Sequence, residues 1–171
     1  EQLYRQILET APDNADVLNL LGLIAQTRGL HSEAIGYFYR AAASAPKHFP
    51  IFFNLGISLA AVGRPIEAIE AYKKALQLKP DLKEAFLCLG NTYWQINRNE
   101  EAAEAFQNAL KLDADYTDAA VNLAEIQNDE AALQQLAQKN PQDARPFYYL
   151  GRRRFAEQKY SEALPDLQKA D

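Results

Sequence analysis

The 171-residue sequence contains one cysteine, two histidines and no methionine. A single cysteine excludes a disulfide within the chain and any zinc site that needs several thiolates. The net charge of −5 leaves no excess of basic residues to cover nucleic-acid phosphates. No apolar run approaches the roughly 20 residues that span a bilayer. These absences predict no nucleic-acid partner and no membrane insertion.

The chain also lacks the short motifs that mark common catalytic sites. It has no Gly-rich phosphate-binding loop, no Gly-x-Ser-x-Gly nucleophile turn and no His-Glu-x-x-His zinc motif. His31 and His48 have no carboxylate or cysteine in helical register. Cys88 is the one cysteine, and a lone cysteine is more often a small apolar residue than a nucleophile. We therefore expect no catalytic residue, no metal site, no cofactor and no enzymatic activity.

What the chain does contain is a repeat of 34 residues. Gly22, Gly56 and Gly90 are 34 residues apart, and Ala124 lies 34 further on. A fixed period of this length indicates stacked structural repeats. Five further columns keep the same step: Leu21, Leu55, Leu89 and Leu123; Ala34, Ala68 and Ala102; Phe38, Tyr72 and Phe106; Ala41, Ala75 and Ala109; Pro46 and Pro80.

The spacing inside each repeat predicts two helices. Numbered from Ala15, positions 4, 7, 8 and 11 carry apolar or small residues, which is the i, i+3, i+4, i+7 spacing of an amphipathic helix. A second stripe at positions 20, 24 and 27 predicts another helix, with an aromatic at 24 beside small residues. At position 15, Gly29, Gly63 and Asn97 predict a turn with positive φ between the two helices.

These features resemble the tetratricopeptide repeat, most clearly in segments 18–46, 52–80 and 86–114. The resemblance implies an all-α fold, a right-handed α-solenoid (superhelix) of stacked helix-turn-helix hairpins. Because both ends fall inside a repeat, we expect the chain to be part of a longer protein. We expect a single repeat domain over residues 1–171, with the second helix of a partial repeat at 1–14, regular repeats at 15–48, 49–82 and 83–116, a shortened repeat at 117–143 and an incomplete repeat at 144–171.

The shortened repeat departs from the period. Ala124 and Gly151 are separated by 27 residues instead of 34, a loss of about two helical turns. We expect a truncated hairpin and a local change in superhelix curvature around residues 128–141. Two interpretations are open: neutral drift in a tolerant repeat array, or a bend that shapes the binding surface.

The resemblance implies a concave surface lined by the first helix of each repeat. Apolar side chains at the expected lining positions indicate an interaction site, unless they only pack against adjacent first helices. Asparagines there offer both a donor and an acceptor to a peptide backbone. The predicted peptide-binding residues are Asn19, Leu23, Phe53, Asn54, Ile57, Leu87, Asn91, Trp94, Tyr148 and Arg152.

Some family members carry a Lys/Asn/Arg clamp for an acidic C-terminal carboxylate, and this sequence does not match it. Asn19 and Asn54 occupy two of the corresponding positions, but the basic members are absent. Glu84 at another of these positions would repel a carboxylate. The clamp is therefore excluded on charge.

Charge is unevenly distributed along the chain. Residues 81–140 contain 11 acidic and 4 basic residues, which form a solvated outer face or steer a basic partner. The arginines at 152–154 are the one basic cluster. It is an anion-binding site beside Tyr148 and Tyr149, plain surface charge, or a contact with a following repeat. At Arg154 we expect the stem to pack and the charged head to reach solvent.

We predict a protein-protein interaction scaffold that binds a peptide segment of a partner in the concave surface. Preorganisation of a rigid surface would lower the ordering cost of binding. Two alternatives stay open. The chain is the non-catalytic arm of a larger enzyme of the glycosyltransferase or methyltransferase type, or it is a self-assembly module that associates through its end repeats. The sequence leaves the compartment open, with the cytoplasm as the expected one.

Overall fold

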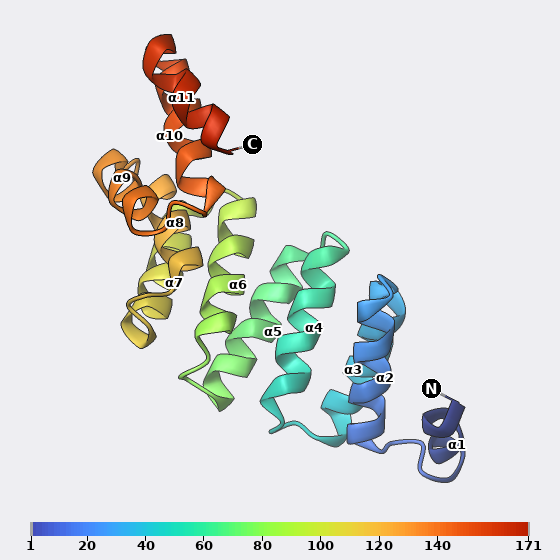
Figure 1. Ribbon diagram of the computed structural model, residues 1–171. Coiled ribbons are helices and arrows are strands. Elements are labelled where there is room, and N and C mark those ends of the chain that lie inside the picture. The colour runs from blue at the N-terminus through green and yellow to red at the C-terminus, as the bar shows by residue number, and fades with distance from the viewer. Residues whose placement is uncertain (1, 171) are drawn as a thin grey trace. The chain divides into compact units, whose positions relative to one another are not determined.

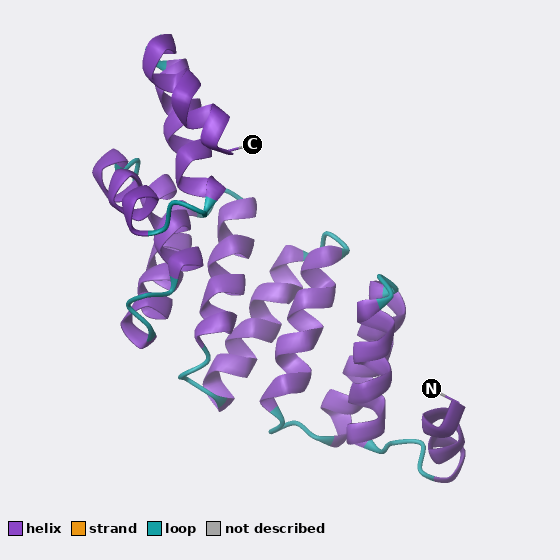
Figure 2. Ribbon diagram, in the orientation of Figure 1, coloured by secondary structure: helices purple, strands orange, loops and turns teal. Residues whose placement is uncertain are grey.

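Helices make up all the regular structure in residues 2–170, the range that the computed structural model describes (Figure 2). In that range there are eleven helices, joined by short turns. The chain divides into two units, Glu1–Arg98 and Asn99–Asp171, and each is described by itself. The prediction of an all-α fold built from stacked helical hairpins is confirmed.

Unit 1 contains one short helix, two hairpins and the first helix of a third repeat (Figure 1). The two helices of each hairpin pack together, and the second helix of one hairpin packs against the first helix of the next. The hairpins of unit 1 therefore stack in chain order. The helices are α1 (Gln2–Thr10), α2 (Ala15–Thr27), α3 (His31–Ser44), α4 (Phe49–Ala61), α5 (Pro65–Leu78) and α6 (Lys83–Gln95).

In each hairpin of unit 1, a glycine on the first helix packs against an aromatic ring on the second helix. A Cβ atom at Gly22 would lie 2.5 Å from the Phe38 ring, and one at Gly56 would lie 2.5 Å from the Tyr72 ring. Both rings are almost completely buried. Because a larger side chain would overlap the ring, the recurring glycine sets how closely the two helices approach.

The turns inside the hairpins adopt the backbone conformation that the sequence predicts. Gly29 and Gly63 have φ of 75° and 74°, and Asn97 has φ of 61°. Glycine has no Cβ to oppose this left-handed region, and asparagine tolerates it better than most residues. Pro65 then begins α5, where its missing N–H leaves no hydrogen bond unmade.

Unit 2 contains α7 (Asn99–Leu112), α8 (Thr117–Ile126), α9 (Glu130–Lys139), α10 (Ala144–Ala156) and α11 (Tyr160–Ala170). Helices α8 and α9 have ten residues each, whereas α4 and α5 of unit 1 have 13 and 14. The 27-residue spacing is thus accommodated by two shorter helices, and no helix is lost. The expected change in superhelix curvature stays a prediction.

One hydrophobic cluster of unit 2 joins the short hairpin to α10. Its buried side chains come from all three helices, and they are aliphatic except for one phenylalanine. In the last hairpin a leucine takes the place of the ring, since a Cβ at Gly151 would lie 2.7 Å from Leu167. The cluster consists of Val121, Ala124, Leu133, Ala137, Phe147 and Leu150.

Candidate functional site

Eight of the ten predicted peptide-binding residues lie on the first helices of unit 1. Helices α2 and α4 contact each other, as do α4 and α6, so the three follow one another within the unit (Figure 1). We call the surface that they share the first-helix face. It is defined by Asn19 and Leu23 on α2, Phe53, Asn54 and Ile57 on α4, and Leu87, Asn91 and Trp94 on α6.

The apolar members of the first-helix face are only partly accessible. All five, Leu23, Phe53, Ile57, Leu87 and Trp94, are half-buried. The Phe53 ring also packs on the buried Tyr72 ring, with centroids 6.2 Å apart and planes tilted by 52°. These side chains therefore contribute to packing with one part of their surface and leave another part open.

Polar side chains tie α2 to α4 on the same face. The Nε2 of Gln26 donates to the backbone oxygen of Asn54 at 3.1 Å and to the Oγ of Ser58 at 2.8 Å. The Nδ2 of Asn54 lies 3.5 Å from the Oδ1 of Asn19, at the limit of a hydrogen bond. This network fixes the relative position of the two helices, and the side chains of Asn19 and Asn54 within it.

Gln26 and Ser58 belong to this network and are missing from the predicted site. The signal for Ser58 is its place in the apolar stretch of α4, where it is fully buried. A buried hydroxyl needs a hydrogen-bond partner, and that requirement points to a polar residue on the neighbouring first helix. The partner's identity follows only from the packing of α2 on α4.

Cys88 lies on α6, and its thiol interacts with the hydroxyl of Tyr72. Burial raises the pKa of the Cys88 thiol and also that of Tyr72. A thiol with a raised pKa is protonated at neutral pH and is a poor nucleophile. The chemistry of this cysteine is therefore that of a packing residue.

The other two predicted residues, Tyr148 and Arg152, lie on α10 in unit 2. Both are exposed, and Arg152 is paired with Glu125 of α8. Its guanidinium also lies 5.8 Å and 5.5 Å from the ring centroids of Tyr148 and Tyr149. Arg152 thus stabilises contacts within unit 2, and we assign no common site with the first-helix face.

The expectation that the head of Arg154 reaches solvent is wrong. Its Nη2 lies 2.9 Å from Glu130 Oε1 of α9, and its Nη1 lies 2.8 Å from Asp166 Oδ2 of α11. The short helices leave carboxylates within reach of position 11, where an aliphatic residue is usual. The neighbouring Arg153 pairs with Glu125 at 3.5 Å. The three arginines all have carboxylate partners with which an anion would have to compete, and the anion-binding interpretation stays a prediction.

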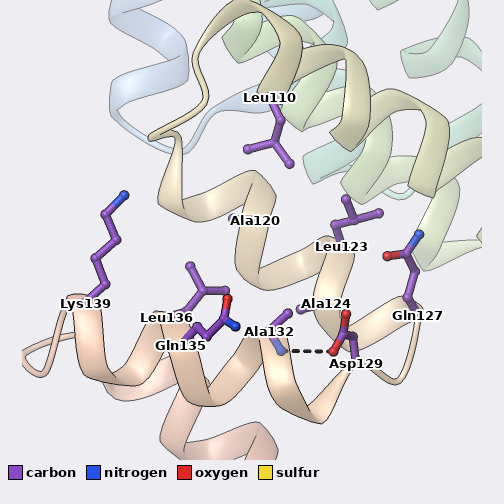
Figure 3. Close-up of a pocket in the computed structure, with 10 residues that line it drawn as sticks. All are labelled: Leu110, Ala120, Leu123, Ala124, Gln127, Asp129, Ala132, Gln135, Leu136 and Lys139. Carbon is purple, nitrogen blue, oxygen red and sulfur yellow. Dashed lines mark hydrogen bonds between the residues drawn. The ribbon is translucent and has the colours of Figure 1, made fainter.

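Unit 2 also contains an apolar pocket of about 370 Å³ between α7, α8 and α9 (Figure 3). Its polar lining includes Asp129, whose carboxylate accepts a hydrogen bond from the backbone N–H of Ala132 at the start of α9. A second pocket of about 230 Å³ shares Ala120, Leu136 and Lys139 with it. The apolar lining consists of Leu110, Ala120, Leu123, Ala124, Ala132 and Leu136.

Two kinds of feature do not occur in residues 2–170. No group of three or more His, Cys, Asp or Glu side chains in that range has an arrangement able to hold a metal ion. Within the same residues, no helix has both the length and the apolar character that crossing a membrane requires.

Sequence comparison matches three family models to the chain. Two tetratricopeptide repeat models match residues 1–49 and 83–116, and a TPR repeat model matches residues 66–97. No curated protein sequence matches the chain.

Solved structures with a similar fold include a tetratricopeptide repeat protein from Parabacteroides merdae ATCC 43184. Its TM-score is 0.85 at 22% identity, over 97% of this chain and 69% of that one. The structure of YrrB, described as a TPR protein with an unusual peptide-binding site, has a TM-score of 0.77 at 17% identity, over 98% and 90% of the two chains. The first TPR of Spaghetti (RPAP3), bound to the HSP90 peptide SRMEEVD, has a TM-score of 0.65 at 20% identity, over 68% and 93%.

Proposed function

The chain belongs to the tetratricopeptide repeat family, and on that premise we propose that it is a protein-interaction scaffold whose first-helix face binds a peptide segment of a partner protein. The proposal concerns α2, α4 and α6 of unit 1. Tyr148 and Arg152 stay predicted contacts of unit 2, and a ligand that reached Arg152 would have to share it with Glu125.

The observation that carries the proposal is the combination of groups on the first-helix face. Half-buried apolar side chains such as Leu87 and Trp94 offer apolar area, and their packing has already removed much of their conformational freedom. The amides of Asn19 and Asn54 are held by the network with Gln26. A surface ordered before binding loses less entropy when the ligand arrives.

Two of the structural neighbours support a peptide as the ligand. YrrB is described by its peptide-binding site, and the RPAP3 structure contains a bound peptide. The RPAP3 peptide is acidic, whereas the first-helix face of this chain contains no basic residue and the first turn of α6 carries Glu84. We therefore propose a peptide that anchors through apolar side chains and backbone hydrogen bonds, without an acidic terminus.

The proposed role is non-catalytic. The one cysteine has a raised pKa because it is buried, and no cluster in residues 2–170 could hold a metal ion. The amide and apolar groups of the first-helix face are suited to recognition, since asparagine amides supply donors and acceptors but no titratable group near neutral pH.

The test is a double substitution, Phe53→Ala with Trp94→Ala. Peptides are first selected against the full chain from a displayed peptide library, and the best is then titrated by calorimetry. We expect the double variant to bind at least ~10-fold more weakly, since buried aromatic anchors dominate peptide affinity. Helicity and the melting temperature are expected to change little.

The matched control is Tyr39→Ala with Ile66→Ala, an aromatic and an aliphatic residue that are exposed on the second helices α3 and α5. This control is expected to keep the parent affinity. If the double variant Phe53→Ala with Trp94→Ala loses helicity and thermal stability as strongly as it loses affinity, Phe53 and Trp94 belong to the packing core between the repeats instead. If both double variants bind equally well, the ligand occupies another surface.

A further inference from the structure

The short hairpin α8–α9 lacks the aromatic ring that fills the hairpins α2–α3 and α4–α5. No aromatic residue occurs between residues 117 and 146. In unit 1 the rings of Phe38 and Tyr72 press against the glycine at position 8. The residue at that position in α8 is Ala124, and the buried side chains of α9 are only Leu133 and Ala137. The hairpin therefore encloses less side-chain volume than its counterparts.

The apolar pocket lies beside this hairpin and reaches Ala124. Ala124 lines it, together with the small side chains of Ala120 and Ala132. Its volume of about 370 Å³ is larger than one aromatic side chain and lies in the range of ligand-binding sites. An apolar group that enters this open pocket gains contacts with the apolar lining that water does not provide.

Two glutamines flank the pocket and have amides available for a ligand. Gln127 follows α8 and Gln135 lies on α9, and Figure 3 shows them on different sides of the pocket. Both are exposed, and neither side chain makes a hydrogen bond to any other residue in the described part of the chain. A side-chain amide can donate to a peptide carbonyl and accept from a peptide N–H at once.

The charge of unit 2 favours a basic ligand. Residues 99–171 contain 14 acidic and 8 basic residues, whereas residues 1–98 contain 9 and 10. The lysine that lines the pocket, Lys139, is paired with Asp115. Its positive charge is therefore offset locally, and the net negative field of the unit attracts cationic partners.

We propose that the α7–α8–α9 pocket binds an aromatic side chain presented by a basic peptide segment of a partner protein. The ring occupies the space beside Ala124, Gln127 and Gln135 pair with the peptide backbone, and flanking lysines or arginines lie in the negative field of unit 2. This site is separate from the first-helix face, and it does not depend on the function proposed for that face.

The test uses the peptide acetyl-Lys-Arg-Trp-Lys-Arg-amide, with 5-fluorotryptophan as its aromatic residue, titrated with the full chain. The fluorine resonance reports on the peptide alone. Ala132→Leu fills the pocket and is expected to weaken binding at least ~10-fold. Its matched control is Ala131→Leu, the same change at the exposed neighbouring residue, which is expected to keep the parent affinity. Both variants are expected to melt at or above the parent temperature.

A second pair of variants tests the amides. Gln127→Ala with Gln135→Ala is expected to weaken binding several-fold, whereas Gln138→Ala, an exposed residue outside the pocket, is expected to have no effect. The double variant Phe53→Ala with Trp94→Ala is expected to bind the probe as the parent does, which separates this site from the first-helix face.

Several outcomes would overturn the proposal. One such outcome would be that the peptide does not bind the parent chain, or that it binds equally to Ala131→Leu and Ala132→Leu. Another would be that a peptide with alanine in place of tryptophan binds as well as the original, because charge attraction alone would then explain the binding. A third would be that indole by itself binds as tightly as the peptide, because the pocket would then be a small-molecule site.

Discussion

The hairpins α4–α5 and α8–α9 are two copies of the same kind of repeat, and they are packed differently. In α4–α5 a glycine admits a buried tyrosine ring, and the contact between the helices is apolar. In α8–α9 the ring is replaced by smaller aliphatic residues, and arginines of α10 bridge to Glu125 and Glu130. The short hairpin thus has no ring packed between its two helices, and ion pairs connect both of its helices to α10.

The difference has consequences for how the two units respond to their surroundings. Apolar packing is insensitive to salt and to titration, whereas partly exposed ion pairs are screened by salt and lost when a carboxylate is protonated. The pocket beside Ala124 belongs to the same change, because the smaller side chains leave space that a ring would fill. Unit 2 therefore combines an apolar pocket with partly exposed ion pairs beside its apolar cluster.

Tyr72→Ala is expected to have the largest effect on stability. It removes a buried ring that contacts Gly56 and Phe53, and the cost of such a truncation is about 3–5 kcal/mol. Native-state hydrogen exchange on the full chain measures it: amides of α4 and α5 are expected to lose protection while those of α10 and α11 do not. An equal loss in both units would show that the units unfold together.

Arg154→Met is expected to have the next largest effect. The Arg154 side chain is 17% exposed and that of its partner Asp166 is 13% exposed, so the substitution leaves a largely buried carboxylate without its cation. Removing one member of a fully buried ion pair strongly lowers the free energy of unfolding. The Arg154–Asp166 pair is partly exposed, so the expected loss is smaller, about 1–3 kcal/mol. Chemical denaturation, followed by a probe in α10, measures the change.

The matched control for Arg154→Met is Arg64→Met in unit 1. Arg64 pairs with Glu67 on the surface, where both side chains are more than 40% exposed. A surface pair of this kind contributes little, so this variant is expected to be indistinguishable from the parent. If the two substitutions cost the same, ion pairs do not distinguish the two units.

Acidification is expected to have the smallest effect, and it acts mainly on unit 2. A hydrogen bond from Arg154 lowers the pKa of Glu130 below its ordinary value of 4.5, and one from Arg145 lowers the pKa of Asp143 below 3.8. Because the folded state holds these pKa values down, the stabilisation is present above the ordinary values and is lost as the pH falls through the lowered ones.

Hydrogen exchange between about pH 7 and about pH 3, corrected for the intrinsic exchange rate, measures the effect. Protection of α9 and α10 is expected to fall more than that of α4 and α5. The pKa of Glu67 in unit 1 is also lowered, by Arg64, but that pair is exposed at a helix start and contributes less. A uniform loss across both units would contradict the comparison.

Much of the fold follows from local spacing. The 34-residue columns predict the glycine–ring contact at Gly22 and Phe38, and position 15 predicts the positive φ of Gly29 and Asn97. The site is less accessible to such reasoning. Spacing identifies the helix that carries Asn54, but the bonds that Gln26 makes to Asn54 and Ser58 depend on the neighbouring helix.

The sequence by itself determined that this chain forms helical hairpins, because the apolar period, the small residues and the turn residues are all encoded within one repeat. Only the tertiary structure decided that Arg154 points its charge at Glu130 and Asp166, and that a pocket lies beside Ala124. These features depend on how close two helices come and on which side chains then meet, and the spacing of residues along one helix does not contain that distance.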